Sequence, residues 1–294
     1  MTGIDHIETL YLQLLFRCNF DCAHCFHGER LAWRDAYTYE QAQHLLALMK
    51  TDYQTSRVVL LGGEPLLHTR LPDLVRHARH DLGLRVEICT NGYRIERRLG
   101  QCADAIDLLR VSLEGLEVAN DRIRRPGSFA AAMHTLAVAR NLGIATGATM
   151  TVTRDTVDDV LPLARLLQEA GVGQLKLHCL RPVGNAVHHP ELTVTEPTAY
   201  TGMLVEVKTA GLTIDIVADE DLVAAEPGCA VLDRGGRIQR IESDPRGALT
   251  MSCKAVGKDA HAFWYDKAAG AIVHRPTVTD ELTLPVADVV YTHV

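Results

Sequence analysis

Three cysteines near the amino terminus, Cys18, Cys22 and Cys25, have the type and spacing to hold a metal centre. They form a C-x3-C-x2-C pattern, so one short loop presents three thiolates. Thiolates at this density suit a cubane iron–sulfur cluster, and three ligands leave one iron open to another molecule. A structural zinc ion needs a fourth ligand, which His24 or His27 could supply, so a small zinc loop is the alternative.

Three further short motifs each follow a strand-like apolar segment. Because the carboxyl ends of parallel strands form the catalytic face of a βα barrel, motifs at these positions are expected to meet the cysteine loop. They are Gly62-Gly63-Glu64-Pro65 after residues 57–61, Thr90-Asn91-Gly92 at the end of residues 84–90, and Ser112-Leu113-Glu114-Gly115 at the end of residues 106–112.

Strand-like and helix-like runs alternate along the first two thirds of the chain. This alternation predicts a parallel sheet with right-handed crossovers. The predicted strands are residues 10–16, 57–61, 84–90, 106–112, 144–152 and 175–180, and the predicted helices are residues 39–49, 71–81, 129–142, 157–170 and 197–210.

From Gly211 the alternation is expected to stop. We therefore predict two parts: residues 1–210 form the main α/β domain, and residues 211–294 form a compact carboxyl-terminal extension that closes the barrel and contributes to the substrate site.

The cysteine loop and the three motifs, in this order, resemble the radical S-adenosylmethionine (SAM) superfamily over roughly residues 8–185. The resemblance implies a partial (β/α)6 TIM-like barrel with a small carboxyl-terminal extension. It also implies a [4Fe–4S] cluster on Cys18, Cys22 and Cys25, whose open iron chelates SAM. Cleavage of SAM would give a 5′-deoxyadenosyl radical that abstracts hydrogen from the substrate. An external low-potential electron donor would supply the electron for this cleavage.

The same resemblance implies which residues touch the cofactor. Arg181-Pro182 is similar to the adenine-side segment of the family, and His24 stands where the family usually has an aromatic residue. Gly62, Gly63 and Glu64 are expected at the methionine amine, Ser112 at the ribose or carboxylate, Arg124 at the carboxylate, and Asn91 among the cofactor-binding residues.

The remaining cysteines bear on the fate of the substrate radical, that is, on whether it is reduced by a thiol or oxidised. Related enzymes with auxiliary clusters show several cysteines with a CxxC pair, whereas residues 211–294 contain only Cys229 and Cys253 and no CxxC. Cys179, Cys229 and Cys253 could still hold an auxiliary cluster. A lone thiol at Cys253 could instead donate a hydrogen atom to the opposite face of a carbon radical and so invert it, or be a buried structural cysteine.

This arrangement also resembles neomycin-type aminoglycoside radical SAM epimerases, enzymes of antibiotic biosynthesis. The net charge of −7 argues against a nucleic-acid partner and is compatible with a small cationic substrate. An acidic stretch could bind ammonium groups, or could simply be a solvated loop; it comprises Asp215, Asp219, Glu220, Asp221 and Glu226.

Three alternatives stay open: a sugar or cyclitol dehydrogenase with an auxiliary cluster, a peptide-modifying radical SAM enzyme, and a cluster protein without turnover. Residues 1–16 carry no targeting signal, and their apolar run is too short to span a bilayer. We therefore expect a cytoplasmic enzyme with no membrane partner.

Overall fold

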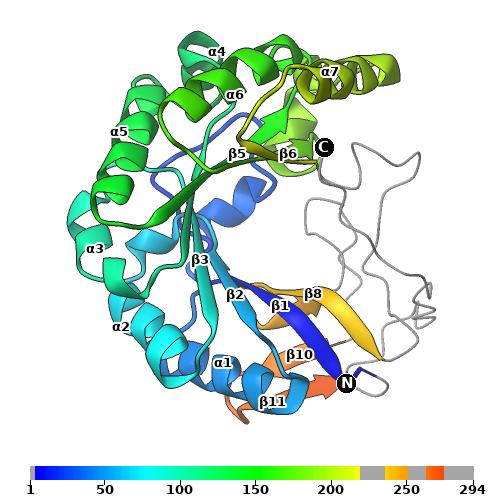
Figure 1. Cartoon of the computed structure of the whole chain (residues 1–294). Coiled ribbons are helices and arrows are strands. Elements are labelled where there is room, and N and C mark those ends of the chain that lie inside the picture. Colours follow the sequence, from blue (N-terminus) through cyan, green and yellow to red (C-terminus); the bar gives the residue numbers. More distant parts are fainter. Residues whose placement is uncertain (1–3, 219–235, 251–262, 275–294) are drawn as a thin grey trace.

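The computed structural model describes residues 4–218, 236–250 and 263–274, which form one eleven-stranded sheet wrapped by helices (Figure 1). Its strands in chain order are β1 (His6–Gln13), β2 (Arg57–Leu61), β3 (Arg85–Thr90), β4 (Leu108–Ser112), β5 (Ala145–Val152), β6 (Gln174–Cys179), β7 (Asp215–Ala218), β8 (Arg237–Ser243), β9 (Ala248–Thr250), β10 (Phe263–Asp266) and β11 (Ala271–His274).

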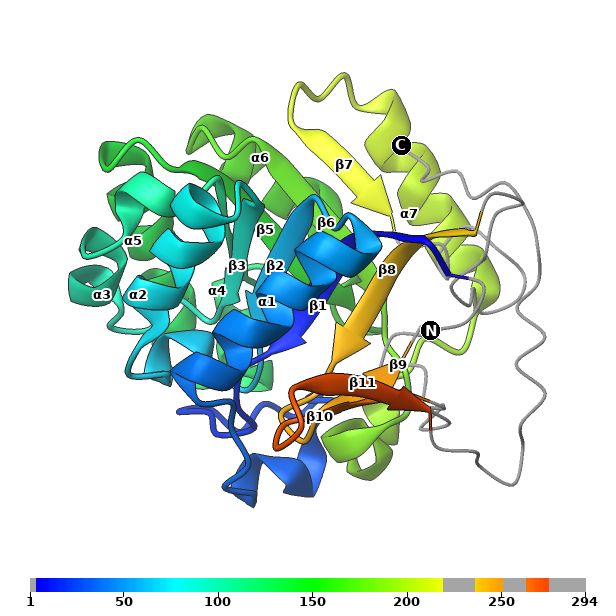
Figure 2. The same cartoon turned by 90° about the horizontal axis from the view of Figure 1, so that it is seen from below.

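The order across the sheet is β11-β10-β9-β8-β1-β2-β3-β4-β5-β6-β7. Every neighbouring pair from β8 to β7 is parallel, whereas β8, β9, β10 and β11 pair antiparallel. The parallel part curves around a central space without closing (Figures 1 and 2). The prediction of an α/β fold with a partial, TIM-like barrel is therefore confirmed.

Helices cover the convex face of this sheet (Figure 1). The first begins with a capping box, in which the Thr38 hydroxyl accepts from the Gln41 amide and the Gln41 side chain accepts from the Thr38 amide. The helices are α1 (Tyr39–Tyr53), α2 (Leu71–Arg76), α3 (Glu96–Gly100), α4 (Glu117–Ile123), α5 (Ser128–Asn141), α6 (Val160–Glu169) and α7 (Pro197–Thr209). None of the helices in the described ranges is long and apolar enough to cross a membrane.

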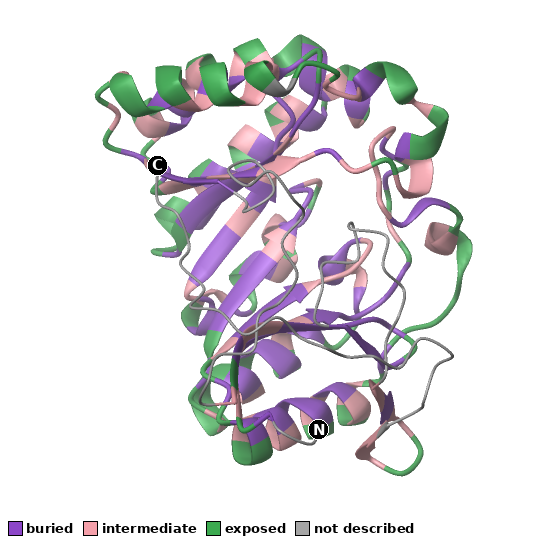
Figure 3. Ribbon diagram, turned by 90° about the vertical axis from the view of Figure 1, so that its right-hand side faces the viewer, coloured by how far each residue is buried: buried purple, intermediate pink, exposed green. Residues whose placement is uncertain are grey.

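The hydrophobic core lies between the helices and the outer face of the sheet. Leu10 and Leu12 of β1 pack there with Leu45 and Met49 of α1, and all four are fully buried. Figure 3 shows the same division, with buried residues on the strands and on the inner helix faces and exposed residues on the outer helix faces. The opposite, concave face of the sheet is left for polar side chains.

Strands from beyond residue 210 extend this sheet at both sides. We predicted that the alternation stops at Gly211, but β7 follows α7 and pairs in parallel with β6, so the alternation continues for one more strand. On the other side, β8 pairs in parallel with β1 along most of its length. The hairpin of β10 and β11 reaches α1, where the Tyr265 hydroxyl lies 3.0 Å from Nδ1 of His44. The division into two domains at residue 210 stays a prediction.

The long loop between β1 and α1 carries the three cysteines and rests on the segment after β2. The Gly63 amide donates to the Leu15 carbonyl (2.8 Å), and the Glu64 amide donates to the Arg17 carbonyl (3.0 Å). A methyl group on Gly63 would overlap the carbonyl oxygens of Phe16 and Arg17. A glycine is therefore required at position 63, because no side chain fits there.

We predict that G63A is destabilised by about 1–3 kcal/mol, because the added methyl group forces the cysteine loop away from β2. Urea denaturation of the cluster-free protein measures this. The matched control is G100A, at the end of α3, where an added methyl group meets nothing within 4 Å. Equal unfolding midpoints for G63A and G100A would contradict the prediction.

Candidate functional site

A cavity of about 940 Å³ occupies the concave side of the sheet and opens at the ends of its strands. Its wall includes all three cysteines of the loop. It also includes five of the six predicted cofactor residues, namely Gly62, Gly63, Asn91, Ser112 and Arg124. The structure thus brings together the motifs that follow β2, β3 and β4, as expected from parallel strands. Cys253, the predicted hydrogen-atom donor, lies outside the described residues.

The cysteine loop directs backbone N–H groups at its own sulfurs. The Phe20 amide donates to Cys18 Sγ (3.4 Å), and the amides of His27 and Gly28 donate to the Cys25 sulfur. Burial raises the pKa of Cys18 to about 11 and that of Cys22 to about 12, so the free thiols are protonated at neutral pH. A metal centre would displace these protons, and N–H groups at the sulfurs stabilise the thiolates it binds.

The geometry favours an iron–sulfur cluster over the alternative zinc loop. In the described ranges no three His, Cys, Asp or Glu side chains converge on one point as a single metal ion requires. Nε2 of His24 faces Glu114 (3.0 Å) and Nε2 of His27 faces the Gly62 carbonyl (3.1 Å), so these two ring nitrogens are directed at groups other than the three cysteines. In a cubane each thiolate binds a different iron, so three thiols on one cavity wall fit it without converging.

Glu64 is the predicted cofactor residue that does not line the cavity. Its fully buried carboxylate accepts from the Thr90 hydroxyl (2.8 Å) and from the backbone amides of Asn91 (2.8 Å) and Leu66 (3.1 Å). Burial raises the pKa of this carboxyl and outweighs the three hydrogen bonds, which lower it. Glu64 therefore joins the end of β2 to the end of β3 and positions Asn91.

A second buried carboxylate, Glu114, stands at the centre of an ionic network. It accepts from Arg124 through Nη2 (2.5 Å) and Nε (3.1 Å), from the His24 ring (3.0 Å), and from the Thr151 amide (2.7 Å). Burial alone would raise the pKa of Glu114, yet the facing His24 and Arg124 side chains lower it to about 2. Glu114 is therefore ionised and orients both neighbours.

Glu114 belongs to one of the three strand-end motifs, and we predicted no role for it from the sequence. Its position offered a signal, because a carboxylate directly after a strand, before a glycine, reaches the catalytic face. The network also explains how His24 replaces an aromatic residue, since Glu114 fixes the orientation of its ring. Arg124 uses Nε and Nη2 for Glu114, and no hydrogen bond from its Nη1 is found within the described residues.

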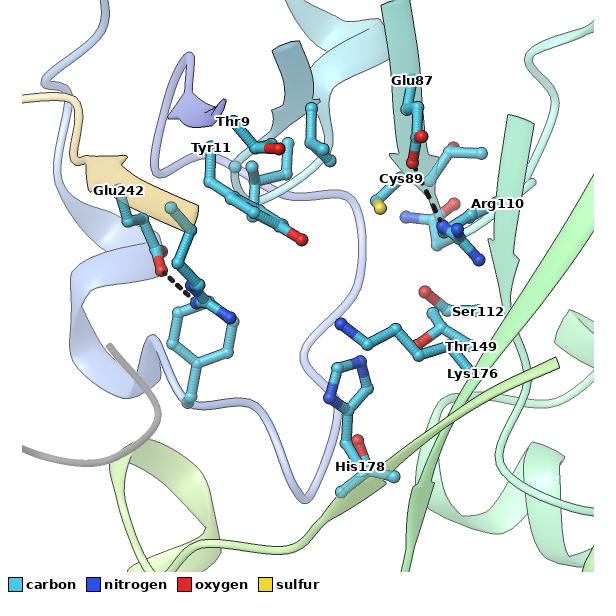
Figure 4. A pocket seen from close by; sticks show the side chains of 18 of the residues that line it. Thr9, Tyr11, Glu87, Cys89, Arg110, Ser112, Thr149, Lys176, His178 and Glu242 are labelled. Carbon is cyan, nitrogen blue, oxygen red and sulfur yellow. Dashed lines mark ion pairs between the residues drawn. The ribbon is translucent and has the colours of Figure 1, made fainter. Parts of the chain in front are cut away.

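The rest of the cavity wall carries charged side chains among apolar ones, whereas the interior of most closed barrels is apolar. Figure 4 shows Arg110, Lys176 and His178 directed into the cavity, with Glu87 and Glu242 facing it from β3 and β8. Glu87 lies 3.5 Å from Arg110, and Glu242 lies 3.5 Å from Arg240. Polar residues at every second position of otherwise apolar strands could have revealed this wall.

The charge of this wall does not favour the cationic substrate that we predicted. Its described residues include eight arginines and lysines against four glutamates. Asp215 of the predicted acidic stretch is hydrogen-bonded to the Gln174 side chain (2.5 Å), and the other four acidic residues lie outside the described ranges. The chain's net negative charge is thus not repeated on this part of the cavity.

Two further thiols, Cys89 and Cys179, line the same cavity. Cys89 faces it from β3 (Figure 4), and Cys179 ends β6, where its sulfur lies 3.4 Å from the Tyr200 hydroxyl. Cys102 is buried away from the cavity and contacts the Arg98 carbonyl. Cys229, the remaining candidate ligand of an auxiliary cluster, lies outside the described residues.

Curated proteins with similar sequences cover part of this chain. The GTP 3′,8-cyclase of Vibrio atlanticus is 29% identical over 38% of this chain and 36% of its own length. The probable GTP 3′,8-cyclase of Sulfolobus acidocaldarius is 25% identical over 60% and 58%, and the pre-heme d1 synthase of Dinoroseobacter shibae is 27% identical over 55% and 40%. The chain therefore spans less than two thirds of each of these relatives.

Solved structures share the fold at low sequence identity. SuiB of Streptococcus suis bound to SAM has a TM-score of 0.71 at 15% identity, covering 87% of this chain and 62% of its own. The enzyme anSMEcpe with bound SAM has a TM-score of 0.62 at 16% identity, covering 85% and 72%. The family model of the radical SAM superfamily matches residues 12–167. The chain therefore belongs to the radical SAM superfamily, whose members use a [4Fe–4S] cluster and SAM.

Proposed function

We propose that this radical SAM enzyme removes a hydrogen atom from a ring carbon of a small polar substrate and returns one from a thiol, which makes it an epimerase. The observation that carries the proposal is one cavity that joins the cysteine loop to a polar wall containing thiols the cluster does not need. A thiol is a suitable donor because its S–H bond is weaker than a C–H bond.

We assign the cluster to Cys18, Cys22 and Cys25. The cluster and SAM, when bound, supply the 5′-deoxyadenosyl radical that removes the substrate hydrogen. Arg124 offers a guanidinium to the SAM carboxylate, and Glu114 holds that guanidinium in place. Gly62 and Gly63 offer bare backbone at the methionine end. Ser112 and Asn91 complete the set of cavity residues proposed to contact SAM.

Inversion needs a donor on the face of the carbon opposite the one that lost hydrogen. When a thiol donates, its S–H bond breaks, a new C–H bond forms, and the sulfur keeps one unpaired electron. One electron from the external donor and one proton from solvent then restore the thiol. The substrate is therefore neither oxidised nor reduced overall.

We propose Cys253 as that donor. The last described residue of β9, Thr250, pairs with Glu242 of β8, and Glu242 lines the cavity. Cys253 follows Thr250 by three residues in the sequence and lies outside the described residues. Cys179 and Cys89 are the competing thiols, because both already line the cavity.

We propose an amino-sugar ring of an aminoglycoside as the substrate. The mixed wall supports a hydroxyl-rich ring, since paired Arg and Glu side chains offer both donors and acceptors. Amines would have to compete with Arg110 for Glu87 and with Arg240 for Glu242, so the hydroxyl groups carry this part of the proposal.

A second candidate is an enzyme acting on a phosphorylated substrate, as the names of the GTP 3′,8-cyclase relatives suggest. The excess of basic residues on the described wall favours it. Incubation of the reconstituted enzyme with SAM, dithionite and either an aminoglycoside or GTP separates the two. Turnover of GTP, with no isomer of any aminoglycoside, would overturn the epimerase proposal.

The thiol variants give the sharpest test of the mechanism. In deuterated water the product should carry solvent deuterium at the inverted carbon. We predict that C253A still cleaves SAM but forms no epimer, while C102A, the matched control away from the cavity, behaves like the wild type. Iron content should be about four per chain, because an auxiliary cluster would raise it to about eight. Normal epimerisation by C253A, with loss of it in C179A or C89A, would move the donor role to that residue.

The Glu114 network predicts a defect in cofactor binding. E114Q removes the negative charge that orients Arg124 and His24, so we expect SAM affinity to fall about tenfold, or about 1.4 kcal/mol. Equilibrium dialysis with the reconstituted protein measures it. E117Q changes an exposed glutamate in the first turn of α4 and should leave the affinity unchanged. An E114Q dissociation constant equal to that of E117Q would contradict the proposed role of Glu114.

A further inference from the structure

Two arginines and two aromatic rings form a surface cluster over the cysteine loop, here called the aromatic–arginine patch (Phe20, Tyr93, Arg94 and Arg125). The rings of Phe20 and Tyr93 meet edge to face, with centroids 5.5 Å apart. The Arg125 guanidinium lies over both rings, 5.2 Å from Phe20 and 4.8 Å from Tyr93, and Arg94 lies over Tyr93 at 5.1 Å. Both arginines are exposed, so the aromatic faces hold two cations at the surface.

These two cations are not neutralised by neighbouring carboxylates. Within the described residues, neither Arg94 nor Arg125 has a carboxylate within ion-pairing distance, whereas the exposed arginines Arg70, Arg79 and Arg154 each pair with an aspartate. Asp121, which lies in α4 four residues before Arg125, is turned to the amides of Gly127 and Phe129 and to the Ser128 hydroxyl. The patch is thus a local positive site on a chain of net charge −7.

The patch also touches the proposed cluster ligands through one residue. Phe20 stands between Cys18 and Cys22, and its own amide donates to Cys18 Sγ (3.4 Å). Arg125 contacts the same loop, because its Nη1 donates to the Asn19 carbonyl (3.4 Å). A partner that binds the patch would contact the ring of Phe20, and the backbone amide of the same residue is hydrogen-bonded to the Cys18 sulfur.

We propose that the aromatic–arginine patch is the docking site of a small acidic electron-carrier protein that reduces the cluster. Carboxylates of the carrier would meet the planar guanidiniums of Arg94 and Arg125, which suit bidentate contacts, and opposite charges would speed the encounter. The carrier loses one electron and the cluster gains it. The proposal goes beyond the substrate chemistry and does not depend on it. It rests only on the assignment of the cluster to Cys18, Cys22 and Cys25.

The test compares two reductants on the reconstituted, cluster-loaded protein. Reduced flavodoxin, an acidic carrier, serves as the probe, and dithionite serves as the small-molecule control. In anaerobic stopped-flow at low salt, we expect R94E/R125E to be reduced by flavodoxin at least about tenfold more slowly than the wild type. The difference should shrink as salt rises, because salt screens the attraction. Reduction by dithionite should be unchanged.

Matched variants separate charge from structure. R165E reverses an exposed arginine on the outer helix α6 and should leave both rates unchanged. R125K keeps the positive charge and should keep most of the flavodoxin rate. R94E alone changes a side chain whose ring contact is with Tyr93 and not with the loop, so it should slow flavodoxin without affecting the cluster.

Titration calorimetry of flavodoxin against the same variants gives a readout without turnover. Weaker binding by R94E/R125E and unchanged binding by R165E would support the patch. The proposal is overturned if flavodoxin reduces R94E/R125E at the wild-type rate and with the wild-type salt dependence, or if R165E slows this reaction as much as R94E/R125E does. It is also overturned if R94E/R125E and R94E both slow reduction by dithionite by the same factor as reduction by flavodoxin. Failure to find an epimer with any substrate leaves these measurements intact, so the two proposals can fail separately.

Discussion

The site depends on the contact between the cysteine loop and the two glycines after β2. The loop connects a strand to a helix over residues 14–38, and a short antiparallel bridge pairs Leu15 with Ala36. Besides this bridge, hydrogen bonds from the amides of Gly63 and Glu64 to the carbonyls of Leu15 and Arg17 hold the backbone of the loop. That approach leaves no space for a Cβ at Gly63, so the position of the loop before Cys18 depends on a glycine here.

A polar barrel interior follows from the open sheet. In a closed eight-stranded barrel the inward side chains fill the centre and are apolar. Here the curved sheet ends at β7, and its concave face carries Glu87, Arg110 and Lys176 around a cavity. Buried carboxylates are tolerable only when paired, which explains the contacts of Glu87 with Arg110 and of Glu242 with Arg240. The stability of the protein must therefore come from the apolar layer beneath the helices.

The parts of the fold that local pattern determines were predictable from the sequence. The strand at residues 57–61 was predicted with its observed bounds, because it is an apolar run before two glycines, and the strand at 144–152 was predicted within one residue. The strand predicted at residues 10–16 was wrong by several residues at both ends. Leu14, Leu15 and Phe16 are buried but belong to the loop, and β1 begins earlier, at His6, where polar residues alternate with apolar ones. The pairing of β8 with β1 joins segments more than 200 residues apart, and no local pattern encodes such a register.

The same limit applies to the site. Spacing alone revealed the three cysteines, because their ligand geometry is local. Glu114 and Arg124 lie before and after α4, and His24 joins them from the loop after β1, so their shared role emerges only when the sheet assembles. Phe20 belongs to both faces of this assembly: it lines the cavity and also packs under Arg125 at the surface. A single loop therefore separates the cavity from the patch proposed to receive the electron carrier. The contact with Gly63 fixes this loop from the side of β2.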